Sequence, residues 1–286
     1  MLEPRPKPLL TQTDPSSIPD RVKTELKGNL KDGEKPQKTA IFVPLGQIAI
    51  MKNHSFQFKQ FTVKQDRCAM KVGTDGVLLG AWTNVTGAKR LLDIGTGTGL
   101  LALMLAQRSP ELLVTAVEIE KEAAEQAKEN VTHSPWASRI DVLNQDILSY
   151  PNKEQFDVIV SNPPYFNNDL LPPNKQRTLA RHNDHLTYAD LIDKVVQLLH
   201  FDGRFSVIIP FNQKEDFITL CNRRGLYLKR MVKVQTVPNA AFKRVLLEFT
   251  LKESVEVDES TLLIEEKRHC YSTEYIELTK DFYLKM

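Results

Sequence analysis

The sequence has few cysteines and no long hydrophobic run. Cys68, Cys221 and Cys270 lie far apart and show no CxxC or Cys/His spacing. This spacing argues against a disulfide framework and against a zinc site, and it fits a reducing compartment. No apolar stretch approaches the length of a membrane span, and the N-terminus lacks the apolar core of a signal peptide. We therefore expect a cytoplasmic protein with no metal and no membrane partner.

Excess charge of either sign is also absent. The 286 residues carry a formal net charge of only +2, with 41% hydrophobic and 26% charged residues. These values are typical of an ordinary globular protein. Because the overall balance does not indicate a nucleic-acid partner, any basic binding surface has to be local.

The first fifty residues differ from the rest of the chain. Six prolines interrupt residues 1–40, both signs of charge are mixed there, and no apolar periodicity is present. Such a segment cannot bury enough apolar surface to offset the entropy lost on ordering. The sequence predicts a disordered leader over residues 1–50 and a single domain over residues 51–286.

Within that domain, buried-strand patterns alternate with helical patterns. The predicted strands are 90–94, 114–119, 140–145, 156–161, 203–210, 226–236 and 244–251. The predicted helices are 100–108, 121–131, 187–200, 214–224 and 272–284. The last two strands are too close for a crossover helix, so they should pair antiparallel. The fold class is therefore α/β: a mostly parallel seven-stranded sheet with an antiparallel C-terminal hairpin and helices on both faces.

A glycine-rich loop, Asp93-Ile-Gly95-Thr-Gly97-Thr-Gly99, joins the first predicted strand to a helix. Glycines at such a turn let the backbone approach a ligand closely. Glu118 ends the next strand, where its carboxylate can hold ribose hydroxyls, and Asp146 follows the third. All of these residues fall at the carboxyl ends of strands, where open parallel sheets bind ligands.

Two cofactor classes compete for this loop. A nicotinamide dinucleotide is disfavoured because the order is G-x-G-x-G instead of G-x-G-x-x-G. Asp93, two residues before the first glycine, would also repel a pyrophosphate. S-adenosylmethionine has no phosphate and carries an ammonium and a sulfonium, so the same carboxylate favours it. We predict S-adenosylmethionine as the cofactor.

Asn162-Pro163-Pro164-Tyr165 directly follows the strand predicted over 156–161. Two prolines cannot continue a sheet ladder, since neither has a backbone N–H to donate. Their carbonyls, the Asn162 amide and the Tyr165 ring would suit a planar substrate that carries an amino group. Taken alone, the tetrapeptide also fits a strand followed by a proline-stiffened turn.

In this order, the glycine loop, Glu118, Asp146 and Asn162-Pro-Pro-Tyr165 resemble the class I S-adenosylmethionine-dependent amino-methyltransferases, which have a Rossmann-like fold. Further segments are similar to the bacterial tRNA(Val) adenine-37 N6-methyltransferases. These segments are 58–61, 66–82, 134–136, 243–247, Tyr271 with Tyr275, and Phe282 with Tyr283. The resemblance covers roughly residues 56–286, and its most specific part is the block 66–82.

The resemblance implies methylation of the exocyclic nitrogen of an adenine in a valine tRNA, so tRNA is the expected partner. It assigns catalysis to Asn162, the Pro163 carbonyl and Tyr165, the last as a stacking platform. Thr74 is expected to touch the cofactor beside Asp93, Gly95, Gly97, Gly99, Glu118 and Asp146. Basic residues expected near RNA phosphates are Lys175, Arg177, Arg181, Lys243 and Arg244.

Several alternatives use the same tetrapeptide. They include an rRNA methyltransferase acting on guanine N2 or adenine N6, a protein glutamine methyltransferase and a DNA adenine methyltransferase. The glutamine enzymes usually carry a helical N-terminal domain, and the DNA enzymes a sizeable target-recognition domain. A non-enzymatic alternative is an RNA-binding subunit that keeps a relic of the cofactor fold.

Overall fold

The computed structural model describes residues 54–153, 155–164, 186–253 and 256–285. The chain divides into two units, residues 1–51 and 52–286, and the described residues all belong to the second. The predicted leader lies outside the described residues, as do Tyr165, Lys175, Arg177 and Arg181. What was predicted for these positions stays a prediction.

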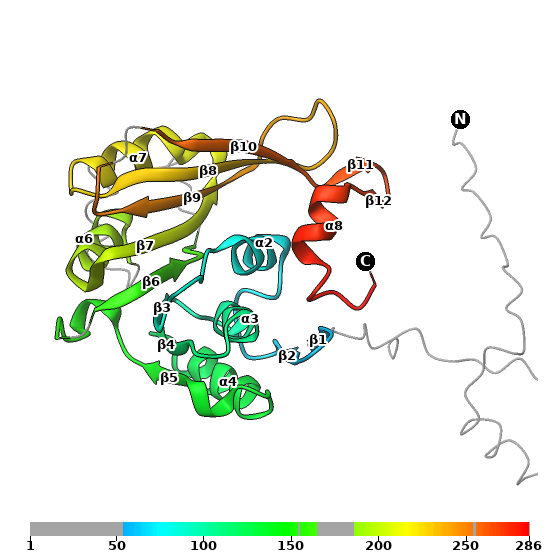
Figure 1. Ribbon diagram of the computed structural model, residues 1–286. Helices are drawn as coiled ribbons and strands as arrows, with labels where there is room; N and C mark the ends of the chain where they lie inside the picture. The colour runs from blue at the N-terminus through cyan, green and yellow to red at the C-terminus, as the bar shows by residue number, and fades with distance from the viewer. Residues whose placement is uncertain (1–53, 154, 165–185, 254–255, 286) are drawn as a thin grey trace, which may run out of the picture. The chain divides into compact units, whose positions relative to one another are not determined.

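The described part of the domain is built on an eight-stranded sheet (Figure 1). Its strands are β3 (Arg90–Ile94), β4 (Leu113–Glu118), β5 (Ile140–Asn144), β6 (Phe156–Ser161), β7 (Leu199–Pro210), β8 (Tyr227–Gln235), β9 (Arg244–Thr250) and β10 (Asp258–Leu263). Their order across the sheet is β10-β8-β9-β7-β6-β3-β4-β5. Strand β9 runs antiparallel to both its neighbours, and every other pair in this sheet is parallel.

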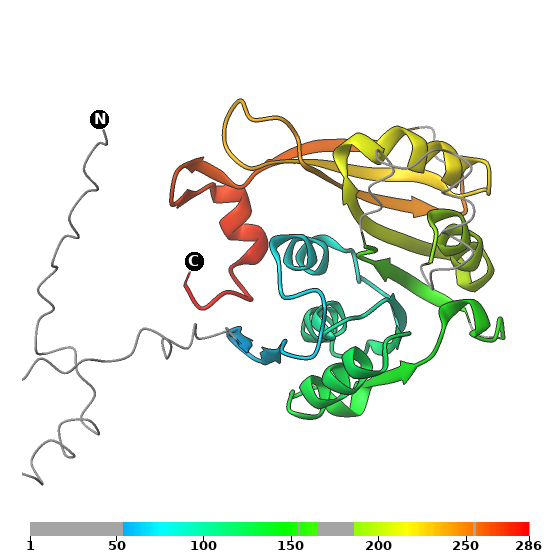
Figure 2. The same ribbon diagram turned by 180° about the vertical axis from the view of Figure 1, so that it is seen from behind.

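Helices cover both faces of the sheet (Figures 1 and 2). One face carries α2 (Thr74–Trp82), α3 (Leu100–Arg108) and α4 (Lys121–Thr132), and α8 (Thr273–Thr279) packs on α2. The other face carries α6 (Tyr188–Leu198) and α7 (Lys214–Asn222). Two small hairpins complete the domain: β1 (Ser55–Gln57) with β2 (Thr62–Lys64), and β11 (Glu265–Lys267) with β12 (Cys270–Tyr271).

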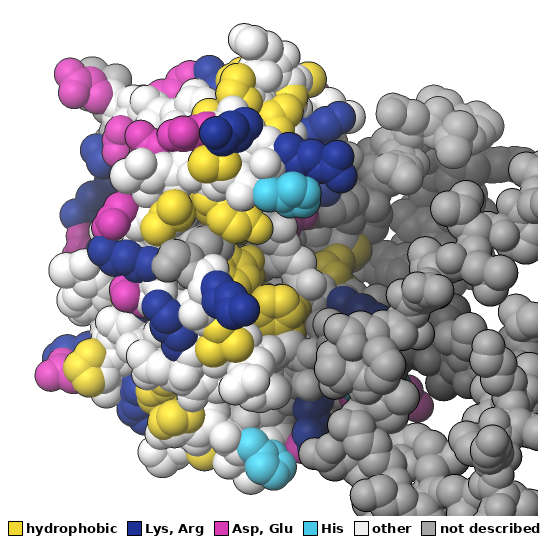
Figure 3. Space-filling model, turned by 90° about the vertical axis from the view of Figure 1, so that its right-hand side faces the viewer, with side chains coloured by type: hydrophobic (Ala, Val, Ile, Leu, Met, Phe, Trp, Pro, Cys, Tyr) yellow, Lys and Arg dark blue, Asp and Glu magenta, His cyan; other side chains and the backbone are white. Residues whose placement is uncertain are grey.

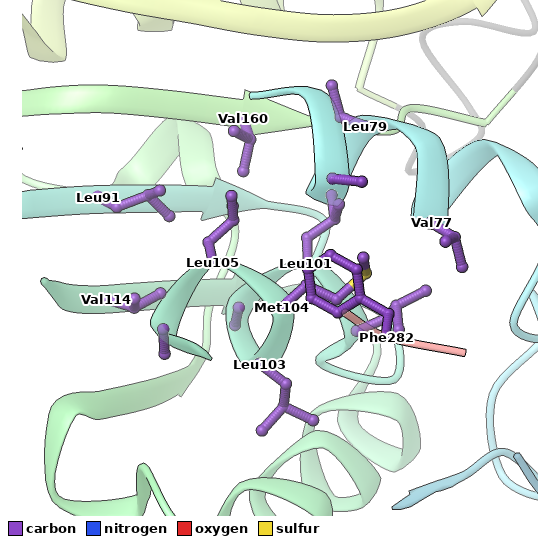
Figure 4. Close-up of a cluster of buried hydrophobic side chains, with 14 of the residues drawn as sticks. Val77, Leu79, Leu91, Leu101, Leu103, Met104, Leu105, Val114, Val160 and Phe282 are labelled. Atoms are coloured by element: carbon purple, nitrogen blue, oxygen red, sulfur yellow. The ribbon is translucent and has the colours of Figure 1, made fainter. Parts of the chain in front are cut away.

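The sheet separates two hydrophobic cores, because successive side chains of a strand point to opposite faces. In β3, Leu91 joins the core beneath α2 and α3, and Leu92 joins the core beneath α6 and α7. Figure 4 shows the first core, where Leu101, Met104 and Leu105 pack between the sheet and α2. Helices α2 and α3 approach closely at Gly80 of α2, where an added Cβ would lie 2.7 Å from the sulfur of Met104 in α3.

The seven predicted strands and five predicted helices are all present, and the antiparallel pairing of β8 with β9 is confirmed. The sheet nevertheless has an eighth strand. Strand β10 escaped prediction because it begins Asp-Glu-Ser-Thr and is exposed along most of its length. The predicted helix 272–284 is shorter than expected and ends at Thr279. The chain turns there, the Phe282 side chain enters the core and its carbonyl accepts from Lys59 N.

Candidate functional site

A cleft of about 1010 Å³ opens at the carboxyl ends of the parallel strands. The glycine loop, the residues that follow β4, β5 and β6, and the segment 67–73 form its walls. The predicted site residues among those that line it are Gly95, Gly97, Glu118, Asp146, Asn162 and Pro163. The fold therefore brings together residues that are far apart in the sequence.

Glu118 fixes the glycine loop. Its Oε2 accepts from Gly97 N at 2.8 Å, and its Oε1 accepts from Glu120 N at 3.0 Å. Each carboxylate oxygen can accept a further bond, so the side chain remains able to bind a ligand hydroxyl. Gly97 has φ +55°, and Gly99, the N-cap of α3, has φ +82°. This left-handed backbone is why the loop requires glycine.

Asp93 lies beneath the loop and does not line the cleft. Its Oδ2 accepts from Thr96 Oγ1 at 2.5 Å, whereas its Oδ1 is buried with no hydrogen-bond partner among the described residues. Burial, helped by the negative charge of Glu118, raises the pKa of Asp93 from 3.8 to about 7. The carboxyl therefore shapes the loop from below and places a titratable charge under it.

Asp146 stands at the cleft as the N-cap of a short 3₁₀ turn, where its Oδ1 accepts from Leu148 N at 2.9 Å. Apolar side chains that the sequence analysis did not single out lie near the strand-end carboxylates. Ile119 follows Glu118, and Ile147 and Leu148 follow Asp146; all three line the cleft. Ile119 and Leu148 are nearly half exposed. In the sequence, the apolar residues that directly follow Glu118 and Asp146 could have predicted this slot, which fits a flat ring.

Two buried amides of α4 hold the segment that covers the glycine loop. Asn130 accepts from Lys64 N and donates to the carbonyls of Lys64 and Thr98. Gln126 accepts from Arg67 N and donates to Asp66 Oδ1. These bonds hold the end of β2 and the residues after it on α4, and Asn130 also joins them to the glycine loop at Thr98. In the sequence, both amides resemble solvated residues of a polar helix.

Thr74 does not line the cleft, and its predicted contact with the cofactor stays a prediction. It lines an adjoining hollow, whereas its neighbours Lys71 and Asp75 line the cleft itself. The reason is helical geometry: Thr74 and Asp75 begin α2, where successive side chains point about 100° apart.

Arg244, predicted to contact RNA, donates from Nε to Asp75 Oδ2 at 2.8 Å. Lys243 beside it is exposed.

Asn162 comes directly after β6 and lines the cleft. Its Oδ1 is buried and has no hydrogen-bond partner among the described residues. Its Nδ2 lies 3.8 Å from the Met70 sulfur, which is a weak acceptor. A buried amide oxygen without a donor is costly, so its presence at a cleft indicates a place for a ligand N–H group. Pro163 is buried, and Pro164 is exposed.

Taken together, these residues fit S-adenosylmethionine. Glu118 offers acceptors for a ribose diol, and Ile119, Ile147 and Leu148 offer an apolar slot for its adenine. Asp93 beneath the loop favours a cationic ligand. Among the described residues, no His, Cys, Asp and Glu side chains gather into a group that could bind a metal ion. The same residues contain no helix that is long and apolar enough to cross a membrane.

Comparison with known proteins identifies the family. Residues 72–216 match the model of the methyltransferase small domain. A tRNA1(Val) (adenine(37)-N6)-methyltransferase from Bacteroides thetaiotaomicron is 54% identical over 237 residues, which cover 82% of this chain and all of that protein. A protein of the same name from Trichodesmium erythraeum is 49% identical, with the same coverage. This chain belongs to the tRNA1(Val) (adenine(37)-N6)-methyltransferase family.

Membership in the tRNA1(Val) (adenine(37)-N6)-methyltransferase family makes the chain an S-adenosylmethionine-dependent methyltransferase with a class I, Rossmann-like fold. A solved structure of a predicted O-methyltransferase from Agrobacterium tumefaciens has the same fold. It superposes with a TM-score of 0.55 at 20% identity and covers 73% of this chain and 96% of its own. This likeness concerns the fold alone, whereas the two relatives above bear the name of an adenine N6-methyltransferase.

Proposed function

We propose that this protein transfers a methyl group from S-adenosylmethionine to the exocyclic N6 of adenine 37 in the anticodon loop of a valine tRNA. The observation that carries the proposal is the Oδ1 of Asn162 at the cleft, which is buried and has no hydrogen-bond partner among the described residues. The relatives that match nearly their whole length to this chain bear the name of that reaction. We also propose that the reaction takes place in the cytoplasm.

The cofactor would lie along the glycine loop. Glu118 would accept hydrogen bonds from its ribose hydroxyls. Asp146 would accept from its adenine amino group or lie at the edge of the adenine ring. Ile119 and Leu148 would enclose that adenine, since both are exposed apolar side chains on the cleft wall. When bound, S-adenosylmethionine supplies an electrophilic methyl group on a sulfonium.

The chemical task of the protein is to make an adenine amino group nucleophilic. Its nitrogen lone pair is delocalised into the ring, so the nitrogen is a poor nucleophile when planar. Asn162 Oδ1 and the Pro163 carbonyl would each accept one amino hydrogen and hold the lone pair toward the methyl group. Orientation and preorganised acceptors then supply the acceleration. The methylated nitrogen is acidic enough to release its proton to water, so no strong base is required.

The remaining contacts concern the RNA. Tyr165, outside the described residues, would stack on the adenine after the base leaves the loop stack, which is least costly in a single-stranded loop. Lys175, Arg177, Arg181 and Lys243 would contact phosphates near the cleft. Arg244 would act on the cleft through Asp75.

The test uses labelled S-adenosylmethionine and total tRNA from a strain that lacks this protein. We expect N6-methyladenosine to appear in one valine tRNA, at the adenine 3′ of the anticodon. Label in ribosomal RNA or in protein would overturn the tRNA assignment and leave a different methyltransferase. Binding of the cofactor without methylation of any substrate would support the non-enzymatic alternative.

A further inference from the structure

A second hollow, of about 630 Å³, adjoins the cofactor cleft. Aromatic rings form much of its lining, and they come from both ends of the domain: Phe56 from β1, Tyr271 from β12, Tyr275 from α8 and Tyr283 from the C-terminal segment. Figure 3 looks onto the side of the domain where α8, β11 and β12 lie, and it shows hydrophobic side chains gathered there with Lys and Arg side chains among them. The methyl-transfer mechanism above uses none of these four rings.

The hollow and the cofactor cleft share a wall. Val72 and Gly73, which directly precede α2, line both cavities. The backbone here is held in place, because Val72 N donates to Gln65 Oε1 at 2.8 Å. Among the described residues, a Cβ placed on Gly73 would meet only the Lys71 carbonyl, at 3.8 Å. Val72 and Gly73 therefore form the wall between the two cavities, and Gly73 adds no side chain to it.

The rings of the hollow are supported from behind. The Tyr271 and Tyr275 ring centroids are 5.1 Å apart, and Tyr283 packs against Phe56 and Phe58. Tyr275 is buried, while Tyr271 is 42% exposed and turns part of its ring to solvent. Ordered aromatic surfaces with one accessible ring are the arrangement on which unpaired bases stack.

The charges around the hollow also suit RNA. Lys285 lines it, and the tip of the β11–β12 hairpin beside it carries Lys267 and Arg268, all three exposed. Within the described residues, none of these three cations is ion-paired to a carboxylate, so all can face phosphates. Glu265 is the one acid in the lining, and a carboxylate can accept from the amino or imino edge of a base.

We propose that this hollow binds the base of a second unpaired nucleotide of the RNA substrate, adjacent in sequence to the adenine that is methylated. Tyr271 provides the stacking face, Glu265 accepts from the edge of the base, and Lys285 with the hairpin cations holds the backbone. This inference rests on the proposed function, since it assumes that the cleft receives an adenine from a single-stranded loop. Two neighbouring bases would then be separated by Val72 and Gly73.

The test compares Tyr271→Ala, Tyr271→Phe and Phe201→Ala in the full chain. Phe201 is a matched control because it is 61% exposed and lies near the start of β7. The starts of the parallel strands are at the opposite end of the sheet from the cleft. The RNA probes are a valine tRNA transcript and two transcripts that are abasic on one or the other side of adenine 37. Affinity for RNA is measured by fluorescence anisotropy, and affinity for S-adenosylhomocysteine by calorimetry.

We expect Tyr271→Ala to lower the affinity for the intact transcript about tenfold. Tyr271→Phe and Phe201→Ala should change it less than twofold, and S-adenosylhomocysteine should bind all variants equally. One abasic transcript should bind the wild type about tenfold more weakly and show no further loss with Tyr271→Ala. Equal RNA affinity of Tyr271→Ala and the wild type would overturn the second base site. It would also be overturned if Tyr271→Ala lowered the affinity for both abasic transcripts by the same factor as for the intact transcript.

Failure of this inference and failure of the proposed function give different results. If the wild type methylates the valine tRNA but Tyr271→Ala binds it normally, the second base site is wrong and the enzyme assignment stands. If the wild type binds S-adenosylhomocysteine but methylates no tRNA, the proposed function fails first.

Discussion

Arg244 Nε and Asp75 Oδ2 lie 2.8 Å apart and join two residues that are 169 positions apart in the chain. Arg244 is the first residue of β9, and Asp75 belongs to the first turn of α2. Both side chains are about one-quarter exposed, at 29% and 24%. A cation predicted to contact RNA is thus bonded to the wall of the cofactor cleft.

Because Arg244 is paired with Asp75, we expect it to act on cofactor binding, whereas its exposed neighbour Lys243 acts on RNA binding. Arg244→Gln should weaken S-adenosylhomocysteine binding several-fold, because Asp75 loses a charged donor worth about 1–2 kcal/mol. It should leave the salt dependence of RNA binding unchanged. Lys243→Gln should leave cofactor affinity unchanged and reduce the salt slope by about 1, as expected for one lost phosphate contact. Calorimetry and RNA binding at several salt concentrations measure both effects. An equal drop in salt slope for the two variants would contradict the assignment.

Asn162→Ala should abolish methyl transfer while cofactor affinity stays nearly unchanged. The substitution removes one acceptor of the amino group, and loss of a comparable preorganised group costs about 100- to 1000-fold in rate. Single-turnover methylation of the valine tRNA measures the rate, and calorimetry with S-adenosylhomocysteine measures binding. Full activity of the variant would refute the clamp mechanism. A large loss of cofactor binding would show that Asn162 holds the cofactor instead.

Asp93 should make stability depend on pH. Its pKa is raised from 3.8 to about 7 in the folded protein by burial and by the charge of Glu118. The folded state therefore binds the proton more tightly, and its stability falls as pH rises from about 4 to 7. The full effect is at most about 4 kcal/mol. Asp93→Asn, which keeps an acceptor for Thr96, should remove this slope in urea unfolding measured across that range. An identical slope in both proteins would contradict the raised pKa.

The same carboxyl should couple cofactor binding to proton release. A cation in the cleft favours ionised Asp93, so affinity for S-adenosylmethionine should increase as pH rises through about 7. Calorimetry at about pH 6.5 in buffers of different ionisation enthalpy measures the proton released by the wild type. Asp93→Asn should release less, and this variant also corrects for titration of the amino group of the cofactor.

Gly97→Ala should weaken cofactor binding, and Gly87→Ala serves as a control. Both glycines have positive φ, +55° and +73°, so each alanine costs about 1–2 kcal/mol of stability. An added Cβ at Gly87 meets no atom of the described residues within 4 Å, whereas at Gly97 it lies 3.5 Å from the Cys68 sulfur in the cleft wall. Thermal unfolding should show similar destabilisation of both variants. Only Gly97→Ala should lose affinity for S-adenosylhomocysteine; a similar loss in Gly87→Ala would mean that general instability is the cause.

The sequence pattern was sufficient to predict the buried central strands and the site residues at their ends. The predicted strands 90–94 and 156–161 match β3 and β6 residue for residue, because strands buried on both faces are rich in apolar residues. The glycine loop, Glu118 and Asp146 could be predicted to converge because parallel strands place their ends at one edge. The antiparallel hairpin followed from the short connection between its strands.

The remainder depended on contacts that the sequence does not display. Helix α2 contains two glycines, and only its close packing on Met104 explains Gly80. Gln126 and Asn130 look like surface residues until the segment after β2 folds onto them. The side of α2 that faces the cleft depends on where the helix begins: Asp75 lines the cleft, and Thr74 lines the adjoining hollow. Each of these outcomes is set by tertiary packing.

The reversed direction of β9 bears on how such an enzyme can acquire a new substrate. The parallel strands deliver their last residues to the cleft edge of the sheet, whereas β9 delivers its first residue, Arg244. The connection between β8 and β9, residues 236–243, therefore emerges at that edge, and Thr236 and Val237 line the aromatic hollow. Insertions or deletions in this connection would reshape the neighbourhood of the substrate while the strands that carry the glycine loop, Glu118 and Asn162 stay fixed. Lineages and laboratory libraries that alter this one connection should diversify target choice at little cost to methyl-transfer chemistry.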